Sequence, residues 1–80
     1  GPFLEAYRAH RLAREAQVLA RLAAGDRRIA EMVPVLYAGV DRRLWPAASL
    51  SVWAHLIALV RHRRAVAEPE PTAQAIYRAV

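Results

Sequence analysis

The segment from Trp45 to Arg64 places the strongest constraint on the fold, because it reads as a helix that is apolar on two opposite sides. At about 100° per residue, one side carries Ala48, Val52, Leu56, Leu59 and Val60. The other side carries Leu50, Ala54, Ile57 and Ala58, and Arg61 closes it. A helix on the surface of an isolated domain normally keeps a polar side toward water. We therefore expect the second apolar side to contact another domain, another chain or a ligand.

The length of the chain predicts one small domain over residues 1–80. A chain this short buries only about 60% of its unfolded surface, so its stability margin is small. It has no cysteine, which excludes disulfides and thiolate metal sites. We find no signal-peptide pattern and no apolar run of about 18 residues, so we expect a cytoplasmic protein with no membrane partner.

All twelve basic residues are arginines, and the net charge is +5. The many Arg and Ala residues are typical of a GC-rich genome, and we expect a bacterial source. A basic balance permits weak, non-specific contact with nucleic acid or another anionic surface. The simpler interpretation is a solvated surface on one part of a larger protein.

The order of predicted elements is three helices followed by two strands, with the helices at about 2–24, 27–38 and 46–62 and the strands within 65–80. Gly25 and Gly39 are predicted helix stops, and Asp26 is a predicted N-cap for the second helix. Pro34 should kink or shorten that helix. This order predicts a mostly α fold, a small winged helix whose second and third helices form a helix-turn-helix and whose hairpin is the wing.

The first predicted helix combines an apolar stripe with charged residues. Leu4, Tyr7, Leu12, Val18, Leu19 and Leu22 form the stripe. Arg11 and Glu15 are four residues apart on the same side, so we expect them to form an ion pair that fixes the helix to its own domain or to a partner domain. His10, Arg14 and Arg21 lie on a different side and are candidate contacts for an anion.

The sequence predicts no catalytic, cofactor or metal residues. The three histidines, His10, His55 and His62, do not stand at metal-ligand spacing with carboxylates. Ser51 and His55 are four apart and within hydrogen-bonding reach, but no third member or glycine-rich elbow accompanies them. We expect His55 to bond a carbonyl or a side chain and His62 to be solvated.

Three segments together resemble one family in order and spacing. They are His10-Arg11-x-x-Arg14-Glu15, Ile29-x-x-Met32-Val33-x-x-Leu36-Tyr37 and Ala47-Ala48-x-x-Ser51-Val52-x-Ala54-His55-Leu56-x-x-Leu59. Over residues 3–66 the chain is similar to the C-terminal winged-helix domain of metallo-beta-lactamase-fold hydrolases, a group that includes beta-lactamase-like endoribonucleases. Arg63 stands where that family usually has a glycine between the third helix and the wing.

The resemblance implies a non-catalytic accessory domain that packs on the catalytic domain of the same parent protein and shapes its substrate entrance. The parent would be a zinc-dependent hydrolase whose metal is bound outside this chain. Arg11, Glu15, Leu50, Ala54, Ile57, Ala58 and Arg61 are the candidates for inter-domain packing.

Two alternatives stay open. One is a stand-alone winged helix that binds nucleic acid, although the third helix has no Asn, Gln or early Arg for reading base edges. The other is a homodimerisation module that uses the second apolar side of that helix.

Overall fold

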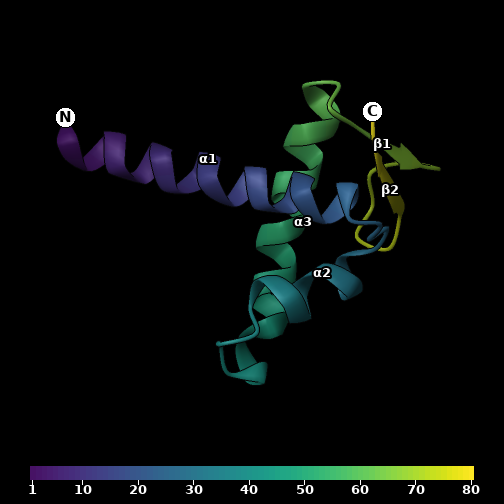
Figure 1. The fold of residues 1–80 in the computed structure, drawn as a ribbon, viewed down its shortest axis with the longest axis horizontal. Helices are drawn as coiled ribbons and strands as arrows, with labels where there is room; N and C mark the ends of the chain where they lie inside the picture. Colours follow the sequence, from purple (N-terminus) through teal and green to yellow (C-terminus); the bar gives the residue numbers. More distant parts are fainter.

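Three α-helices precede a two-stranded antiparallel sheet in the computed structural model, which describes residues 1–80. They are α1 (Pro2–Ala23), α2 (Ile29–Leu36) and α3 (Trp45–Arg61), followed by β1 (Ala65–Glu68) and β2 (Ile76–Ala79). A short 3-10 helix, η1 (Arg42–Leu44), leads into α3. The prediction of a mostly α winged helix is confirmed, with the β1–β2 sheet as the wing (Figure 1).

The turn after α1 depends on a glycine. Gly25 has φ +111°, a left-handed conformation that side chains disfavour. Its N–H donates to the Leu22 carbonyl at 3.1 Å, and the Asp26 N–H donates to the Arg21 carbonyl at 3.0 Å. These two bonds satisfy carbonyls that would otherwise be unpaired at the helix end. The predicted stop at Gly25 is therefore confirmed.

The start of α2 differs from the prediction. We expected Asp26 to cap a helix beginning near residue 27, but α2 begins at Ile29. Glu31 provides the cap instead, because its Oε1 accepts from the backbone N–H groups of Arg27 at 2.7 Å and Arg28 at 2.9 Å. The Asp26 carboxylate is occupied by the Arg21 guanidinium, with Nε–Oδ2 at 2.8 Å.

The end of α2 also differs in detail. Pro34 lies inside the helix, which ends at Leu36 instead of near residue 38. Gly39 was predicted as a left-handed stop, but it does not have a positive φ. The connection is held by the Trp45 indole instead, whose Nε1 donates to the carbonyls of Tyr37 at 3.1 Å and Val40 at 3.2 Å.

A single core joins all three helices to the wing. From α1 and α2 it takes Val18, Leu22, Ile29, Met32 and Val33. From α3 and the wing it takes Ala48, Val52, Leu56, Leu59, Ala65, Ala75 and Tyr77. The predicted core side of α3 is therefore confirmed, with Val60 partly buried beside it.

The N-terminal half of α1 lies outside this core. Residues 1–13 are all exposed, and α1 projects beyond the rest of the molecule (Figure 1). Leu4, Tyr7 and Leu12 belong to the predicted apolar stripe of this helix but are 65%, 65% and 57% exposed. Only the C-terminal part of α1 crosses α3 (Figure 1), so these side chains lie outside the core. We call residues 1–13 the α1 arm.

The turn from α3 into β1 resembles the turn after α1, but without a glycine. Arg63 has φ +59°, its N–H donates to the Val60 carbonyl at 3.1 Å, and the Arg64 N–H donates to the Leu59 carbonyl at 2.9 Å. Arg63 thus occupies the position where the resemblance places a glycine. A residue with a Cβ pays a steric cost in this conformation.

The wing is short and is anchored to the helices. β1 pairs antiparallel with β2, with Ala65 opposite Ala79 and Glu68 opposite Ile76. The Trp53 Nε1 donates to the Pro71 carbonyl at 3.0 Å, so α3 holds the loop between the strands. The Tyr77 hydroxyl donates to the Thr72 carbonyl at 2.6 Å from within the core.

The segment Arg42–Arg61 has the length and composition that a membrane-crossing helix needs, contrary to the expectation that no such run exists. Only 22% of its most apolar window is buried in this structure. The core helix of a small domain meets the same criterion, and one side of α3 fills the core described above.

Candidate functional site

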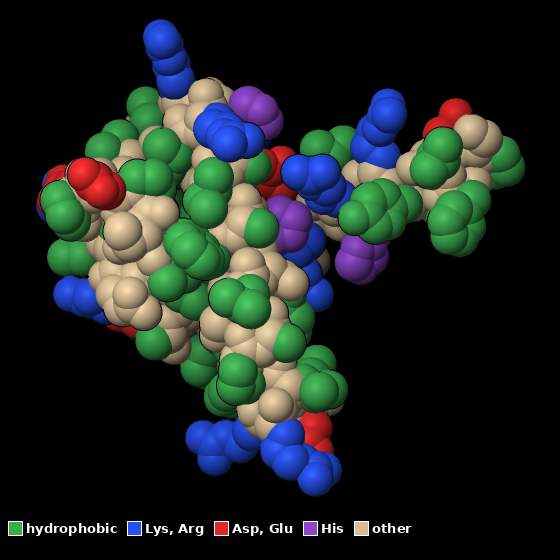
Figure 2. Space-filling view, turned by 180° about the vertical axis from the view of Figure 1, so that it is seen from behind, with side chains coloured by type: hydrophobic (Ala, Val, Ile, Leu, Met, Phe, Trp, Pro, Cys, Tyr) green, Lys and Arg blue, Asp and Glu red, His purple; other side chains and the backbone are tan.

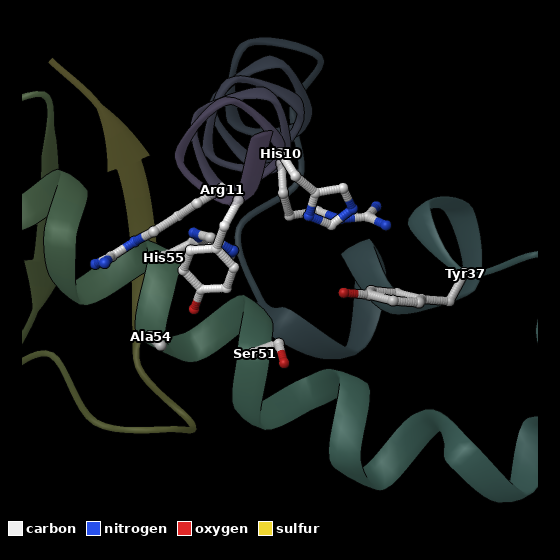
Figure 3. Close-up of a pocket in the computed structure, with 8 residues that line it drawn as sticks. His10, Arg11, Tyr37, Ser51, Ala54 and His55 are labelled. Atoms are coloured by element: carbon white, nitrogen blue, oxygen red, sulfur yellow. The ribbon is translucent and has the colours of Figure 1, made fainter. Parts of the chain in front are cut away.

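A pocket of about 410 Å³ lies where the α1 arm, the end of α2 and the middle of α3 meet (Figure 3). Helix α1 contributes Tyr7, His10, Arg11 and Arg14. Tyr37 follows α2, and α3 contributes Ser51, Ala54 and His55. The lining contains two arginines, two histidines and no carboxylate. We call this hollow the basic pocket.

Arg14 is held in place at one wall of the basic pocket. Its guanidinium carbon lies 4.6 Å from the centroid of the Tyr37 ring, within the range of a cation–π contact. Its Nη1 also donates to Gln17 Oε1 at 2.9 Å. Neither contact neutralises the charge, so Arg14 presents a positioned positive group.

The predicted ion pair between Arg11 and Glu15 is absent. Arg11 is exposed and lines the basic pocket, whereas Glu15 is partly buried and its Oε1 is enclosed without a hydrogen-bond partner. A spacing of four residues brings two side chains to one side of a helix, but it does not oblige them to pair. The pairing hypothesis for these two residues was therefore wrong.

His55 does not make the hydrogen bond expected of it, either with Ser51 or with a carbonyl, although both residues line the pocket. Burial lowers the pKa of His55 below its ordinary value of 6.5. The Glu15 carboxylate opposes this lowering of the pKa, while the charges of Arg11 and Arg14 add to it. His55 therefore favours the neutral form, with two ring nitrogens free of protein partners.

Arg21, the third candidate for anion contact, does not join His10 and Arg14 in the pocket. Its Nε and Nη2 bond the two carboxylate oxygens of Asp26 at 2.8 and 3.2 Å. This bidentate pair offsets the charge of Arg21 within the domain. Of the three candidate anion contacts on α1, His10 and Arg14 therefore line the pocket, whereas Arg21 pairs with Asp26.

A second surface is the outer side of α3, formed by Leu50, Ala54, Ile57, Ala58 and Arg61. Leu50 is 63% exposed, Ala54 and Arg61 are exposed, and Ile57 and Ala58 are partly buried. None of them belongs to the core. Hydrophobic side chains gather over α3 and along the arm in Figure 2. We call these five residues the α3 outer face.

Sequence reasoning missed two contributors to these surfaces. Tyr37 appears in the sequence analysis only within a segment that resembles the family, but its hydroxyl points into the space between α1 and α3 (Figure 3). Phe3 was not considered, yet it is 83% exposed on the arm. No local pattern distinguishes a tyrosine that lines a pocket from one that only fills a core.

No group of three His, Asp or Glu side chains in the structure is placed to hold a metal ion. The pocket's own lining offers nitrogen and hydroxyl groups but no carboxylate. This chemistry suits an anion better than a cation.

One comparison with known proteins gave a match. A family model described as a beta-lactamase associated winged helix domain matches residues 29–76. This range contains α2, α3, β1 and the first residue of β2, so α1 precedes it. Comparisons with curated proteins and with solved structures found no match.

Proposed function

Because the chain belongs to the family of beta-lactamase associated winged helix domains, we propose that it is a non-catalytic accessory domain of a metallo-beta-lactamase-fold hydrolase. The domain would follow the catalytic domain of the same protein, pack on it and help to shape the substrate entrance. The zinc of such a hydrolase would be bound by the catalytic domain.

The exposed apolar residues of the α1 arm carry this proposal. Phe3, Leu4, Tyr7 and Leu12 are all more than half exposed on thirteen residues that the core does not touch. Exposed apolar patches of this kind mark contact surfaces. The α3 outer face adds a second such surface, with Leu50 at its N-terminal end.

Aspartate substitutions in the natural protein that carries this domain test the proposal. Leu12→Asp on the arm and Leu50→Asp on the α3 outer face should lower the midpoint of thermal unfolding and the hydrolase rate, because each places a charge in the interface. Leu44→Asp is the matched control, since Leu44 in η1 is 58% exposed, compared with 57% for Leu12 and 63% for Leu50. If all three variants have the same midpoint of thermal unfolding and the same hydrolase rate, the packing role is refuted.

A stand-alone nucleic-acid-binding function has one observation in its favour. Arg61, Arg63 and Arg64 are exposed together where α3 ends. They would contact phosphates without reading bases, so binding should weaken steeply as salt rises. Absence of binding to duplex or single-stranded nucleic acid at low salt would remove this alternative.

A homodimer formed through the α3 outer face is the remaining candidate. Leu50 and the neighbouring apolar groups of that face would bury one another across a two-fold axis. Sedimentation of the chain over a range of concentrations distinguishes a dimer from a monomer.

A further inference from the structure

We propose that the free edge of β1 pairs with the same edge of a second copy of this chain, so that two wings join into one four-stranded antiparallel sheet. This interface uses no residue of the α1 arm or of the α3 outer face, on which the accessory role depends. Both strands lie at the side of the molecule away from the N-terminus of α1 (Figure 1).

The backbone groups of β1 divide between the two sides of the strand. The Val80 N–H donates to the Arg64 carbonyl at 3.2 Å, which fixes the phase of the β1–β2 ladder. In an antiparallel ladder the backbone groups of every second residue point toward the partner strand. The N–H and C=O groups of Ala65 and Ala67 therefore point away from β2.

The two outer edges of the sheet differ. The edge of β2 is covered at Tyr77, whose N–H donates to the Arg27 carbonyl at 2.8 Å. Outside the β1–β2 ladder, no backbone hydrogen bond of the structure involves residues 65–68. A row of unpaired N–H and C=O groups at a sheet edge is a template for another strand. The edge of β1 is therefore the one open to pairing.

One antiparallel register of two β1 strands uses both outward residues of each copy. In this register Ala65 faces Ala67 of the second copy, and Val66 lies opposite its own equivalent on a two-fold axis. Each Ala65–Ala67 pair would exchange two backbone hydrogen bonds across the interface.

The neighbouring registers are less favourable. A shift of two residues in one direction places Pro69 opposite Ala65, and proline has no N–H to donate. A shift in the other direction places Arg63 opposite Ala67, but Arg63 has φ +59° and lies in the turn before the strand. The symmetric register around Val66 is therefore the one that the chain supports.

The two ends of β1 carry opposite charges that this register brings together. Arg64 takes part in none of the ion pairs of the structure, which use Arg21, Arg43 and Arg78. Glu68 Oε1 lies 3.3 Å from Arg78 Nη1, and the Glu68 side chain is 50% exposed, so its carboxylate can accept a second guanidinium. Arg64 of each copy would pair with Glu68 of the other copy.

The side chains between these charges suit a second strand. Ala65 is buried and Ala67 is partly buried on the core side of the sheet, while Val66 is 48% exposed on the other side. Two Val66 side chains would cover each other where the strands cross the axis. Because β1 has only four residues, we expect a weak dimer that depends on concentration.

Sedimentation of the chain at concentrations up to about 1 mM, the weak end of specific binding, tests the pairing. Arg64→Glu and Glu68→Arg should each weaken self-association about tenfold, because each places like charges opposite each other. An equimolar mixture of the two variants should associate again, because the acidic strand of one faces the basic strand of the other. A mixture that associates no better than either variant alone would overturn the proposal.

Matched variants separate this interface from general charge effects and from the α3 outer face. Arg8→Glu and Glu5→Arg make the same changes of charge on the arm and should leave self-association unchanged. Leu50→Asp should also leave it unchanged, whereas a dimer formed through the α3 outer face would be lost. The amides of Ala65 and Ala67 should exchange more slowly as the chain concentration rises. A monomer at every concentration, or self-association lost only in Leu50→Asp, would overturn the proposal without affecting the accessory role.

Discussion

Both halves of α1 carry large apolar side chains, but these side chains have very different surroundings. The arm carries Phe3, Leu4, Tyr7 and Leu12, all more than half exposed, whereas Val18 and Leu22 in the second half are 0% and 2% exposed. One continuous helix contains both, so helix propensity does not explain the difference. The second half crosses α3 and touches the wing, while the first half extends past both (Figure 1). Apolar periodicity therefore identifies the side of a helix that needs a contact, but not which molecule supplies it.

Hydrogen exchange should show the largest contrast between these halves. Amides of the arm should exchange through local fraying at almost no free-energy cost, while amides around Val18 and Leu22 should require global unfolding, at about 5 kcal/mol or more. Exchange measured residue by residue on the chain by NMR provides the comparison. Protection of residues 5–12 equal to that of residues 18–23 would show that the arm is packed in solution.

Truncation of one leucine in each half should give the next largest effect. Leu22→Ala should cost about 2–5 kcal/mol of unfolding free energy, because it opens a cavity in the core. Leu12→Ala should stay within about 0.5 kcal/mol, since its side chain is already in water. Denaturant unfolding measures both values. Similar costs for the two variants would contradict the division of α1 into an arm and a core half.

Arg63→Gly should increase the difference in stability between the α1 arm and the rest of the domain, because it stabilises the turn between α3 and β1 and not the arm. The left-handed conformation costs a residue with a Cβ about 1–2 kcal/mol, and glycine removes this cost. Because glycine also loses more backbone entropy on folding, we expect a net stabilisation of about 1 kcal/mol. Arg63→Ala is the control, because alanine keeps the Cβ and removes the same charge. A gain for alanine as large as for glycine would assign the effect to charge. Exchange in the arm should not change in either variant.

Glu15→Gln tests the boundary between the halves and should have the smallest effect. The Glu15 carboxylate raises the pKa of His55 against the lowering caused by burial, so its removal should lower that pKa further. Because the folded pKa lies below the ordinary value of 6.5, the unfolded chain binds more protons between the two values. The free energy of unfolding therefore falls as the pH drops from the ordinary pKa of His55 to its folded pKa. The fall should be larger in Glu15→Gln, because the folded pKa is lower there.

An NMR titration of the His55 ring measures the pKa in both proteins. Glu15→Asp serves as the control, because it keeps the charge. An unchanged or higher pKa in Glu15→Gln would mean that the Glu15 carboxylate does not act on His55.

The sequence predicted the parts of the fold that depend on local periodicity and turn chemistry. The spacing of Val52 and Leu56 in α3 identified core positions correctly. Gly25 identified the end of α1, because its φ of +111° is a local requirement.

The sequence did not show which of two similar side chains makes a given contact. Asp26 and Glu31 are both plausible caps for α2, and the choice depends on Arg21, which binds Asp26 across the turn. The candidate site shows the same limit. His10 and Arg14 were recognised on α1, but Tyr37 and Ser51 come from other helices and join them only through tertiary packing.

The anchoring of the wing loop has a consequence for how this domain can diversify. The Trp53 indole and the Tyr77 hydroxyl donate to the carbonyls of Pro71 and Thr72, which are main-chain atoms that every amino acid possesses. The anchoring of the loop therefore depends on the two aromatic donors and not on the side chains of the loop residues. Substitutions can accumulate at the tip of the wing without detaching it, which leaves that tip free to be tailored to whatever lies next to it.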